Sequence, residues 1–203
     1  GLLAPLEHGE VDHRGSEQWR ADVLAAGRTD NGVWGGKLMW NQTPLLVARG
    51  RVGSGSLRTS IRWLFGGGDP VFVHVYREDI AAQAVSMWRA VQTRVWRGDG
   101  GDGSSASDAT VYDARGIAHL AGILAEQERQ WRQWFSAEGI EPLDIEFVEL
   151  VKEPTKAAAR VLEAIGQAPL LAPPPPLQSQ SDQRSRQWVQ RYREDAAQNG
   201  YPA

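Results

Sequence analysis

The sequence contains no cysteine among its 203 residues. This excludes disulfides, thiolate zinc sites and a cysteine nucleophile. It is compatible with a reducing compartment, and we expect a cytoplasmic protein. No apolar run approaches the ~18 residues of a transmembrane segment, and nothing resembles a signal peptide. The four histidines are scattered without metal-ligand spacing, so we expect no metal. A net charge of −3 argues against binding nucleic acid through a general positive field.

Common nucleotide-binding and hydrolase motifs are also missing. The stretch Gly53-Ser54-Gly55-Ser56 lacks the lysine of a phosphate-binding G-x-x-x-x-G-K-[ST] loop, which argues against a nucleotide-dependent kinase. The one G-x-G-x-x-G stretch, residues 98–103, follows an expected helix rather than a strand, so we interpret it as chance. Neither G-x-S-x-G nor H-E-x-x-H occurs.

The residues that are present indicate one globular domain, residues 1–203, with 41% hydrophobic and 23% charged residues. Hydrophobic periodicity predicts an α/β fold with a parallel central sheet flanked by helices. The Gly-rich residues 98–108 predict a flexible loop and the Pro-rich residues 172–181 a stiff spacer. We expect two clear strands at 71–76 and 143–148, a weaker one within 33–40, and helices at 17–26, 43–49, 57–65, 79–95, 115–137, 154–165 and 182–198.

Arg77 is the first candidate binding residue. It follows the buried strand 71–76 and precedes a helix, at the strand end where open α/β sheets bind ligands. Its planar fork and the helix N-terminus both suit a phosphate, and Ser86, two turns into the helix, could add a hydroxyl donor. The alternative is that Arg77 pairs with Glu78 or Asp79 at the surface. His74, within the strand, is interpreted as a buried residue with its hydrogen bonds satisfied.

The last helix carries a second candidate site. Arg184, Arg186, Arg191 and Arg193 lie within ten residues that contain no acid. Arg184 and Arg191 share a helix face with Trp188 between them, a pattern that can clamp an anion against an aromatic surface. Such local charge suits a small anion better than DNA or RNA. The alternative is an ordinary solvated helix face.

A third candidate site is Gly35-Gly36-Lys37-Leu38-Met39-Trp40-Asn41-Gln42. Lys37 beside two glycines could approach an anionic group in transfer. Trp40 and Asn41 offer stacking and hydrogen bonding of the kind that holds a sugar. The alternative is a structural strand end. Tryptophan is abundant, with nine residues against four phenylalanines, which suits a core, a sugar or adenine platform, or both.

Long stretches containing these residues resemble the bacterial carbohydrate sulfotransferases that act on trehalose. The resemblance covers nearly the whole chain, and its motifs are rich in tryptophan and therefore specific. The matching stretches are residues 31–46, 76–79, 83–97, 127–135 and 182–193.

The resemblance implies a sulfotransferase fold related to the P-loop nucleotide kinases. It also implies transfer of a sulfuryl group from 3′-phosphoadenosine 5′-phosphosulfate to the 2-hydroxyl of α,α-trehalose, towards cell-envelope sulfolipids, by a homodimer. In such enzymes an Arg and a Ser at the positions of Arg77 and Ser86 hold the 3′-phosphate of the sulfate donor. Gln183 and Arg184, in the last matching stretch, are expected to contact the donor too. Lys37, Trp40 and Asn41 are then expected near the sugar and the reaction centre.

The family begins with a strand, a phosphosulfate-binding loop and a helix, and Gly1 starts downstream of all three. We therefore expect about 30 residues of such a unit to be missing and expect weak or no turnover from these 203 residues alone. Pro5-Leu6-Glu7-His8 is similar to a Pro-x-Glu-aromatic stretch that carries the general base, which makes Glu7 a candidate base. The alternative for Glu7 is an exposed carboxylate near the terminus. The alternative for the protein is a noncatalytic module that binds 3′-phosphoadenosine nucleotides or a partner chain.

Overall fold

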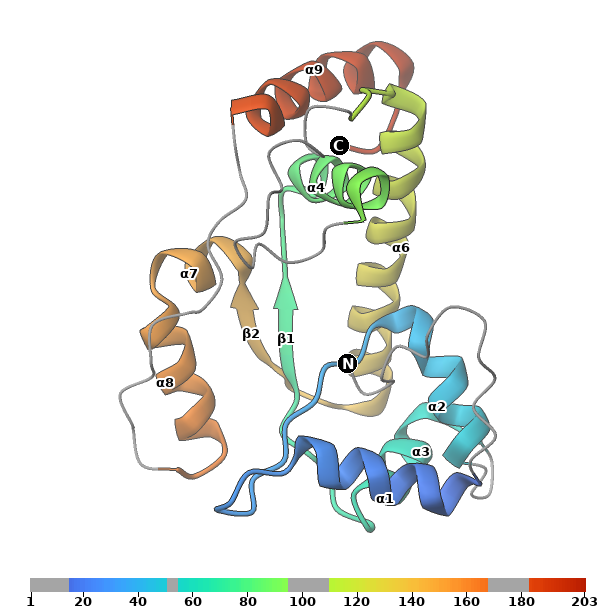
Figure 1. Ribbon diagram of the computed structural model, residues 1–203, viewed down its shortest axis with the longest axis vertical. Helices are drawn as coiled ribbons and strands as arrows, with labels where there is room; N and C mark the ends of the chain where they lie inside the picture. Colours follow the sequence, from blue (N-terminus) through green and yellow to red (C-terminus); the bar gives the residue numbers. More distant parts are fainter. Residues whose placement is uncertain (1–14, 51–54, 95–109, 168–182) are drawn as a thin grey trace. The chain divides into compact units, whose positions relative to one another are not determined.

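The computed structural model describes residues 15–50, 55–94, 110–167 and 183–203 (Figure 1). The chain divides into two compact units, Gly1–Pro70 and Val71–Ala203, and each is described by itself. The expected loop 98–108 and spacer 172–181, as well as Glu7, lie outside the described residues.

The first unit is helical. Its elements are α1 (Ser16–Gly27), the short 3-10 helix η1 (Trp40–Gln42), α2 (Thr43–Gly50) and α3 (Leu57–Leu64). The helices α2 and α3 pack against each other, and the predicted helices are confirmed within a residue or two. The buried apolar side chains of this unit are Trp19, Leu46, Leu57, Ile61 and Leu64.

The prediction of a strand within residues 33–40 is wrong. Within the described residues 28–40, the β pairing is limited to an isolated antiparallel bridge between Arg28 and Trp34. The Trp34 indole folds back over glycines: a Cβ on Gly36 would lie 2.1 Å from its Cη2 atom, and one on Gly27 would lie 2.3 Å from its Nε1. The indole N–H donates to the carbonyl of Val23 at 3.0 Å. The chain therefore wraps around one side chain instead of extending.

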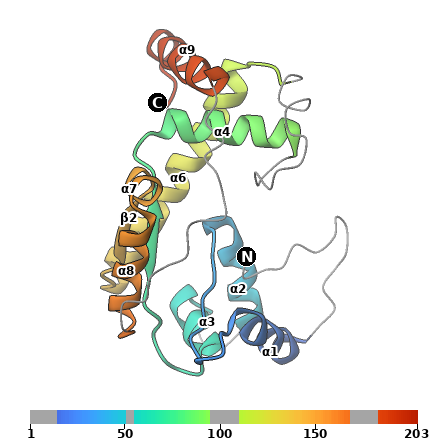
Figure 2. The same cartoon turned by 60° about the vertical axis from the view of Figure 1, so that its left-hand side comes forward.

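The second unit holds a parallel sheet of two strands, β1 (Val73–Tyr76) and β2 (Leu143–Glu146), with Val73 opposite Leu143 and Tyr76 opposite Glu146. The chain leaves β1 for α4 and α6 and returns to β2, and helices α7, α8 and α9 follow (Figures 1 and 2). The α/β class is confirmed, although the unit is mostly helical. The helices are α4 (Ile80–Thr93), α6 (Ala114–Glu138), α7 (Phe147–Lys152), α8 (Pro154–Ala164) and α9 (Gln183–Asn199).

Local signals set most helix ends. The Asp79 carboxylate caps α4 by accepting the N–H of Ala82 at 2.9 Å, and Gly139 ends α6 in a left-handed conformation with φ of 62°. One boundary was predicted wrongly. The strand expected to reach residue 148 stops at Glu146, whose carboxylate accepts the N–H of Val148 and starts α7. Helix α7 was not expected.

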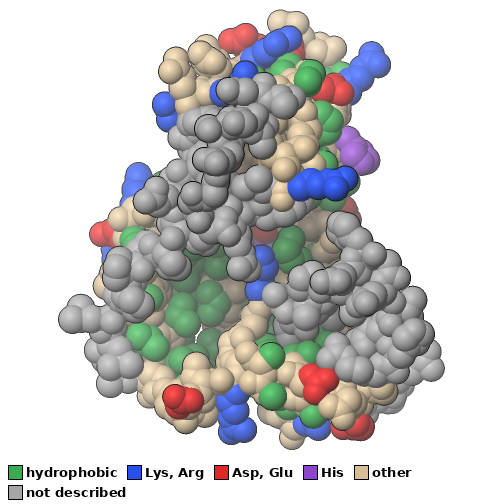
Figure 3. Space-filling view, in the orientation of Figure 1, with side chains coloured by type: hydrophobic (Ala, Val, Ile, Leu, Met, Phe, Trp, Pro, Cys, Tyr) green, Lys and Arg blue, Asp and Glu red, His purple; other side chains and the backbone are tan. Residues whose placement is uncertain are grey.

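The strand β1 is less buried than its sequence indicates. Val73 is 37% exposed and Val75 is 52% exposed, and Figure 3 shows hydrophobic side chains on the face where Figure 1 draws the two strands. Helix α6 covers the opposite face, which carries His74. Helix α8 packs beside β2, where Ile145 is only 2% exposed. Among the described residues of this unit, the Val75 side of β1 has no comparable cover, so the expectation of a buried strand is correct for the His74 face and wrong for the Val75 face.

His74 ties β1 to β2 and to α6. It is 6% exposed, and its Nδ1 lies 2.8 Å from Asp144 while its Nε2 lies 3.1 Å from Glu128. A neutral imidazole has one N–H, so only the protonated ring can donate to both carboxylates. The hydrogen bond with Glu128, helped by the one with Asp144, raises the pKa of His74 against the opposing effect of burial. The interpretation of His74 as a satisfied buried residue is confirmed.

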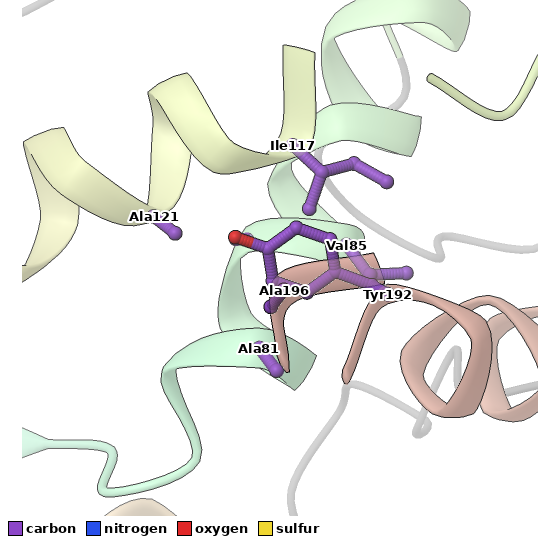
Figure 4. Packing of buried hydrophobic residues seen from close by; sticks show 7 residues of the cluster. Ala81, Val85, Ile117, Ala121, Tyr192 and Ala196 are labelled. Carbon is purple, nitrogen blue, oxygen red and sulfur yellow. The ribbon is translucent and has the colours of Figure 1, made fainter. Parts of the chain in front are cut away.

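The core of the second unit lies where α4, α6 and α9 meet (Figure 4). Tyr192 of α9 is fully buried there, and its hydroxyl donates to the carbonyl of Pro202 at 2.5 Å. Most of its neighbours are alanines, whose small side chains let the three helices approach closely. The buried cluster consists of Ala81, Ala84, Val85, Ile117, Ala121, Tyr192 and Ala196.

Candidate functional site

Arg77 directly follows β1, and α4 and α9 lie beyond the same ends of the strands (Figure 1). Its side chain is half-buried, and its guanidinium carbon lies 4.9 Å from the centre of the Phe147 ring. Its Nε atom is buried and has no hydrogen-bond partner among the described residues. A buried donor without an acceptor costs about 1–3 kcal/mol, and more when charged. The position is therefore suited to a ligand that supplies an acceptor, such as a phosphate.

The charge of Arg77 is set by its surroundings. Burial lowers the pKa of Arg77, while Asp79 and Glu146 act in the opposite direction. The guanidinium nevertheless remains protonated at neutral pH, because arginine titrates far above it. Arg77 thus presents a partly desolvated cation, which attracts an anion more strongly than a cation in water does.

The alternative pairing of Arg77 with Glu78 or Asp79 is not found among the described residues. One oxygen of Asp79 caps α4 by accepting the N–H of Ala82, and the other accepts from Nη2 of Arg193 at 2.9 Å. Asp79 is therefore occupied by its own helix and by α9.

Ser86 lies two turns into α4, and its side chain is exposed. The expected donor contacts of the last helix, Gln183 and Arg184, form the start of α9. Helix α4 packs against α9, so the structure brings the helix that carries Ser86 to the helix that begins with these two residues. Arg89 of α4 makes this connection, because its Nη1 donates to the hydroxyl of Ser185.

Arg191, one member of the clamp predicted across Trp188, lies against a different aromatic ring in the structure. The guanidinium carbon of Arg191 lies 4.1 Å from the centre of the Tyr112 ring, and Arg191 Nε lies 4.0 Å from Asp195. The Tyr112 hydroxyl donates to the same carboxylate at 2.5 Å. Arg191 is therefore held by a tyrosine and an aspartate of the second unit, an arrangement that sequence spacing within α9 cannot reveal.

Lys37, Trp40 and Asn41 belong to the first unit. Lys37 and Asn41 are exposed and Trp40 is half-buried. Trp40 and Asn41 are the first two residues of η1. Two local hydrogen bonds stabilise this turn: the Thr43 hydroxyl donates to the Trp40 carbonyl at 2.8 Å, and the Met39 N–H donates to the Gln42 side chain at 3.0 Å. Thr43 is also the first residue of α2.

A shallow depression of about 580 Å³ also lies in the first unit. None of the candidate residues lines it; its lining consists of Glu17, Arg20, Thr59, Arg62, Trp63, Gly66 and Gly67. In the described part of the chain, no group of three or more His, Asp or Glu side chains is arranged to hold a metal ion. No described helix is long and apolar enough to cross a membrane.

Two residues of this region were missed from the sequence. Phe147 was placed in a strand, and Arg89 was not singled out although it lies three residues after Ser86 and therefore on the same helix face. That i, i+3 spacing is the one signal that could have identified Arg89.

Comparison with known proteins gives consistent matches. A family model described as Stf0 sulphotransferase matches residues 2–195. The trehalose 2-sulfotransferase of Mycolicibacterium smegmatis is 50% identical over 207 residues, which cover 99% of this chain and 76% of that relative. The trehalose 2-sulfotransferase of Mycobacterium tuberculosis is 52% identical over 206 residues, with the same coverage of both chains.

Proposed function

Because the chain belongs to the Stf0 sulphotransferase family, we propose that it transfers a sulfuryl group from 3′-phosphoadenosine 5′-phosphosulfate to the 2-hydroxyl of α,α-trehalose. The observation that carries the proposal is the identity of about half of all residues to two trehalose 2-sulfotransferases along 99% of the chain. The partly desolvated guanidinium of Arg77 at the end of β1 supports the choice of an anionic donor.

The donor site in this proposal lies in the second unit. Arg77 binds the 3′-phosphate of the donor through parallel N–H groups, and its buried Nε gains the acceptor that it lacks. Ser86 adds a hydroxyl donor, and Gln183 and Arg184 add contacts from α9. These interactions fix the nucleotide but do not take part in bond making, so they lower the Kd of the donor more than they raise kcat.

The reaction in this proposal is an in-line displacement at sulfur. The 2-oxygen of trehalose forms a bond to sulfur while the bond from sulfur to the bridging phosphate oxygen breaks, and 3′-phosphoadenosine 5′-phosphate leaves with the electron pair. Glu7 takes the proton of the sugar hydroxyl, and Lys37 stabilises the charge that develops on the phosphate oxygen. Trp40 and Asn41 hold the sugar. The homodimer implied by the resemblance and the cytoplasmic location expected from the lack of cysteine are part of the same proposal.

The test is a transfer assay on the protein as its gene encodes it. The protein is incubated with ³⁵S-labelled donor and trehalose, and the site of sulfation is read by NMR of the product. We expect label on the 2-hydroxyl of trehalose and little on maltose, a disaccharide with another glycosidic linkage. Label on neither sugar, with the nucleotide still bound, would instead favour the noncatalytic module.

A further inference from the structure

We infer that Arg89 is a positioning residue of the nucleotide site: it holds the first turns of α9, with Gln183 and Arg184, against the face of α4 that carries Ser86. This inference rests on the proposed function, because it concerns how the site for the nucleotide is assembled. Arg89 acts on the nucleotide only through Ser185 and Trp188.

Helix α9 is anchored unevenly along its length. Its buried side chains, Tyr192 and Ala196, both lie in its second half and enter the core shared with α4 and α6. Arg193, also in the second half, is paired with Asp79 of α4 at 2.9 Å. The first half, which carries the expected nucleotide contacts, has no fully buried residue, and only Trp188 and Val189 at its end pack against the edge of the core. The position of the first turn, with Gln183 and Arg184, therefore depends on contacts nearer the surface.

Arg89 supplies such contacts at the start of α9. Its Nη1 donates to the hydroxyl of Ser185, and its guanidinium carbon lies 6.0 Å from the centre of the Trp188 ring. Trp188 in turn packs edge-on against Tyr112, with ring centres 5.5 Å apart. One side chain of α4 thus contacts two successive turns of α9.

The spacing of Ser86 and Arg89 along α4 links this contact to the expected nucleotide site. Ser86 and Arg89 are three residues apart and so lie on one face of the helix. The contact with Ser185, the residue next to Arg184, brings the beginning of α9 to that face. Without Arg89, the first turns of α9 can fray as helix ends do, and Gln183 and Arg184 move away from the nucleotide. The cost falls on nucleotide affinity rather than on the chemical step.

The test compares the affinity of variants for 3′-phosphoadenosine 5′-phosphate by calorimetry. Hydrogen bonds to charged groups are stronger than those between neutral groups, so we expect Arg89→Ala to weaken binding about tenfold or more. Ser185→Ala should weaken it in the same direction, and the double variant should bind like Arg89→Ala alone, because both changes break one contact. Arg89→Lys keeps a cationic donor group but loses the planar guanidinium, and it should recover part of the affinity. Gln190→Ala, on the exposed side of α9, is the matched control and should bind like the wild type.

Kinetics separates positioning from general loss of structure. In Arg89→Ala the KM for the sulfate donor should rise about tenfold, by the same hydrogen-bond estimate, while kcat at saturating donor stays within about twofold. Wild-type affinity in Arg89→Ala would overturn the inference, as would weak binding in Arg89→Ala with wild-type binding in Ser185→Ala, since that pattern indicates direct contact. A wild-type protein that neither binds the nucleotide nor transfers sulfate would instead show that the proposed function is wrong. If Arg89→Ala does not fold, Ser185→Ala and Arg89→Lys still decide the question.

Discussion

Two glycines of helix α6 should respond in opposite ways to replacement by alanine. In a helix interior the change normally stabilises a protein by up to about 1 kcal/mol, because alanine has the better helix propensity. A Cβ on Gly122 would meet no atom of the described residues within 4 Å. A Cβ on Gly116 would lie 2.5 Å from Cη2 and 2.6 Å from Cζ3 of Trp88, so this glycine is the gap into which the indole of α4 fits.

The Trp88 ring cannot easily move aside. Its indole N–H donates to the carbonyl of Val111 at 2.9 Å, and the ring packs against the buried cluster of α4, α6 and α9. Overpacking of this kind costs about 1–3 kcal/mol. Gly122→Ala should therefore raise the free energy of unfolding by up to about 1 kcal/mol. The free energy of unfolding of Gly116→Ala should be lower than that of Gly122→Ala by about 1–3 kcal/mol.

Urea unfolding followed by tryptophan fluorescence measures both variants under the same conditions. In a Trp88→Leu background, Gly116→Ala should lose most of its cost, because the colliding ring is gone. Equal stabilisation by the two alanines in the wild-type background would refute the reasoning and with it the packing of α4 on α6.

Three further changes test other parts of the structure. The pKa of His74 is raised above 6.5, so the stability that protonated His74 contributes should be complete below about pH 6.5 and lost as the pH rises through the raised pKa. His74→Gln should lower the free energy of unfolding by about 1.5–3 kcal/mol at pH 6. If stability still declines to the same extent at alkaline pH in that variant, the assignment to His74 is contradicted. Asp79→Ala should destabilise the protein by about 1 kcal/mol more than Asp79→Ser, which keeps a capping oxygen for α4, and equal unfolding midpoints in urea would argue against the cap. Glu7→Gln should lower kcat by about 10²–10⁴-fold at unchanged nucleotide affinity, and an unchanged kcat would exclude Glu7 as the base.

Most helices could be predicted because their ends depend on local chemistry. Asp79 and Asp113 cap α4 and α6 through their own first turns, Gly139 ends α6, and Pro154 starts α8. Each of these signals acts within four residues, which is the range that a sequence pattern can report.

The predictions that were wrong depended on long-range contacts or on a pattern that suits both a strand and a helix. Residues 143–148 alternate in polarity and suit a strand as well as a helix start, and the Glu146 carboxylate decides between the two. Trp34 prevents a strand by folding over Gly27 and Gly36. The helical spacing of apolar residues in α4 places Val91 on the same face as Ala84 and Trp88, yet Val91 is 46% exposed, because the smaller residues of that helix are the ones that face α6 and α9.

The residues of the candidate site also differ in how much the sequence could say about them. The position of Arg77 between β1 and α4 could be predicted, because a strand end and a helix start are both visible in the sequence. Arg89 could not be assigned a role, because its partner Ser185 is 96 residues away along the chain. The occupation of Arg191 by Tyr112 likewise depends on how α9 packs, which spacing within one helix does not show.

The central claim is that Arg77, at the end of β1, is the anchor of the sulfate donor. Calorimetric titration of the wild type and Arg77→Ala with 3′-phosphoadenosine 5′-phosphate tests it most directly, with Arg115→Ala as a control that also removes one positive charge from an exposed position. We predict saturable binding to the wild type and to Arg115→Ala, and a loss of about 100-fold or more in Arg77→Ala, as expected when a buried charged partner is removed. Equal affinity in Arg77→Ala and the wild type would contradict the account.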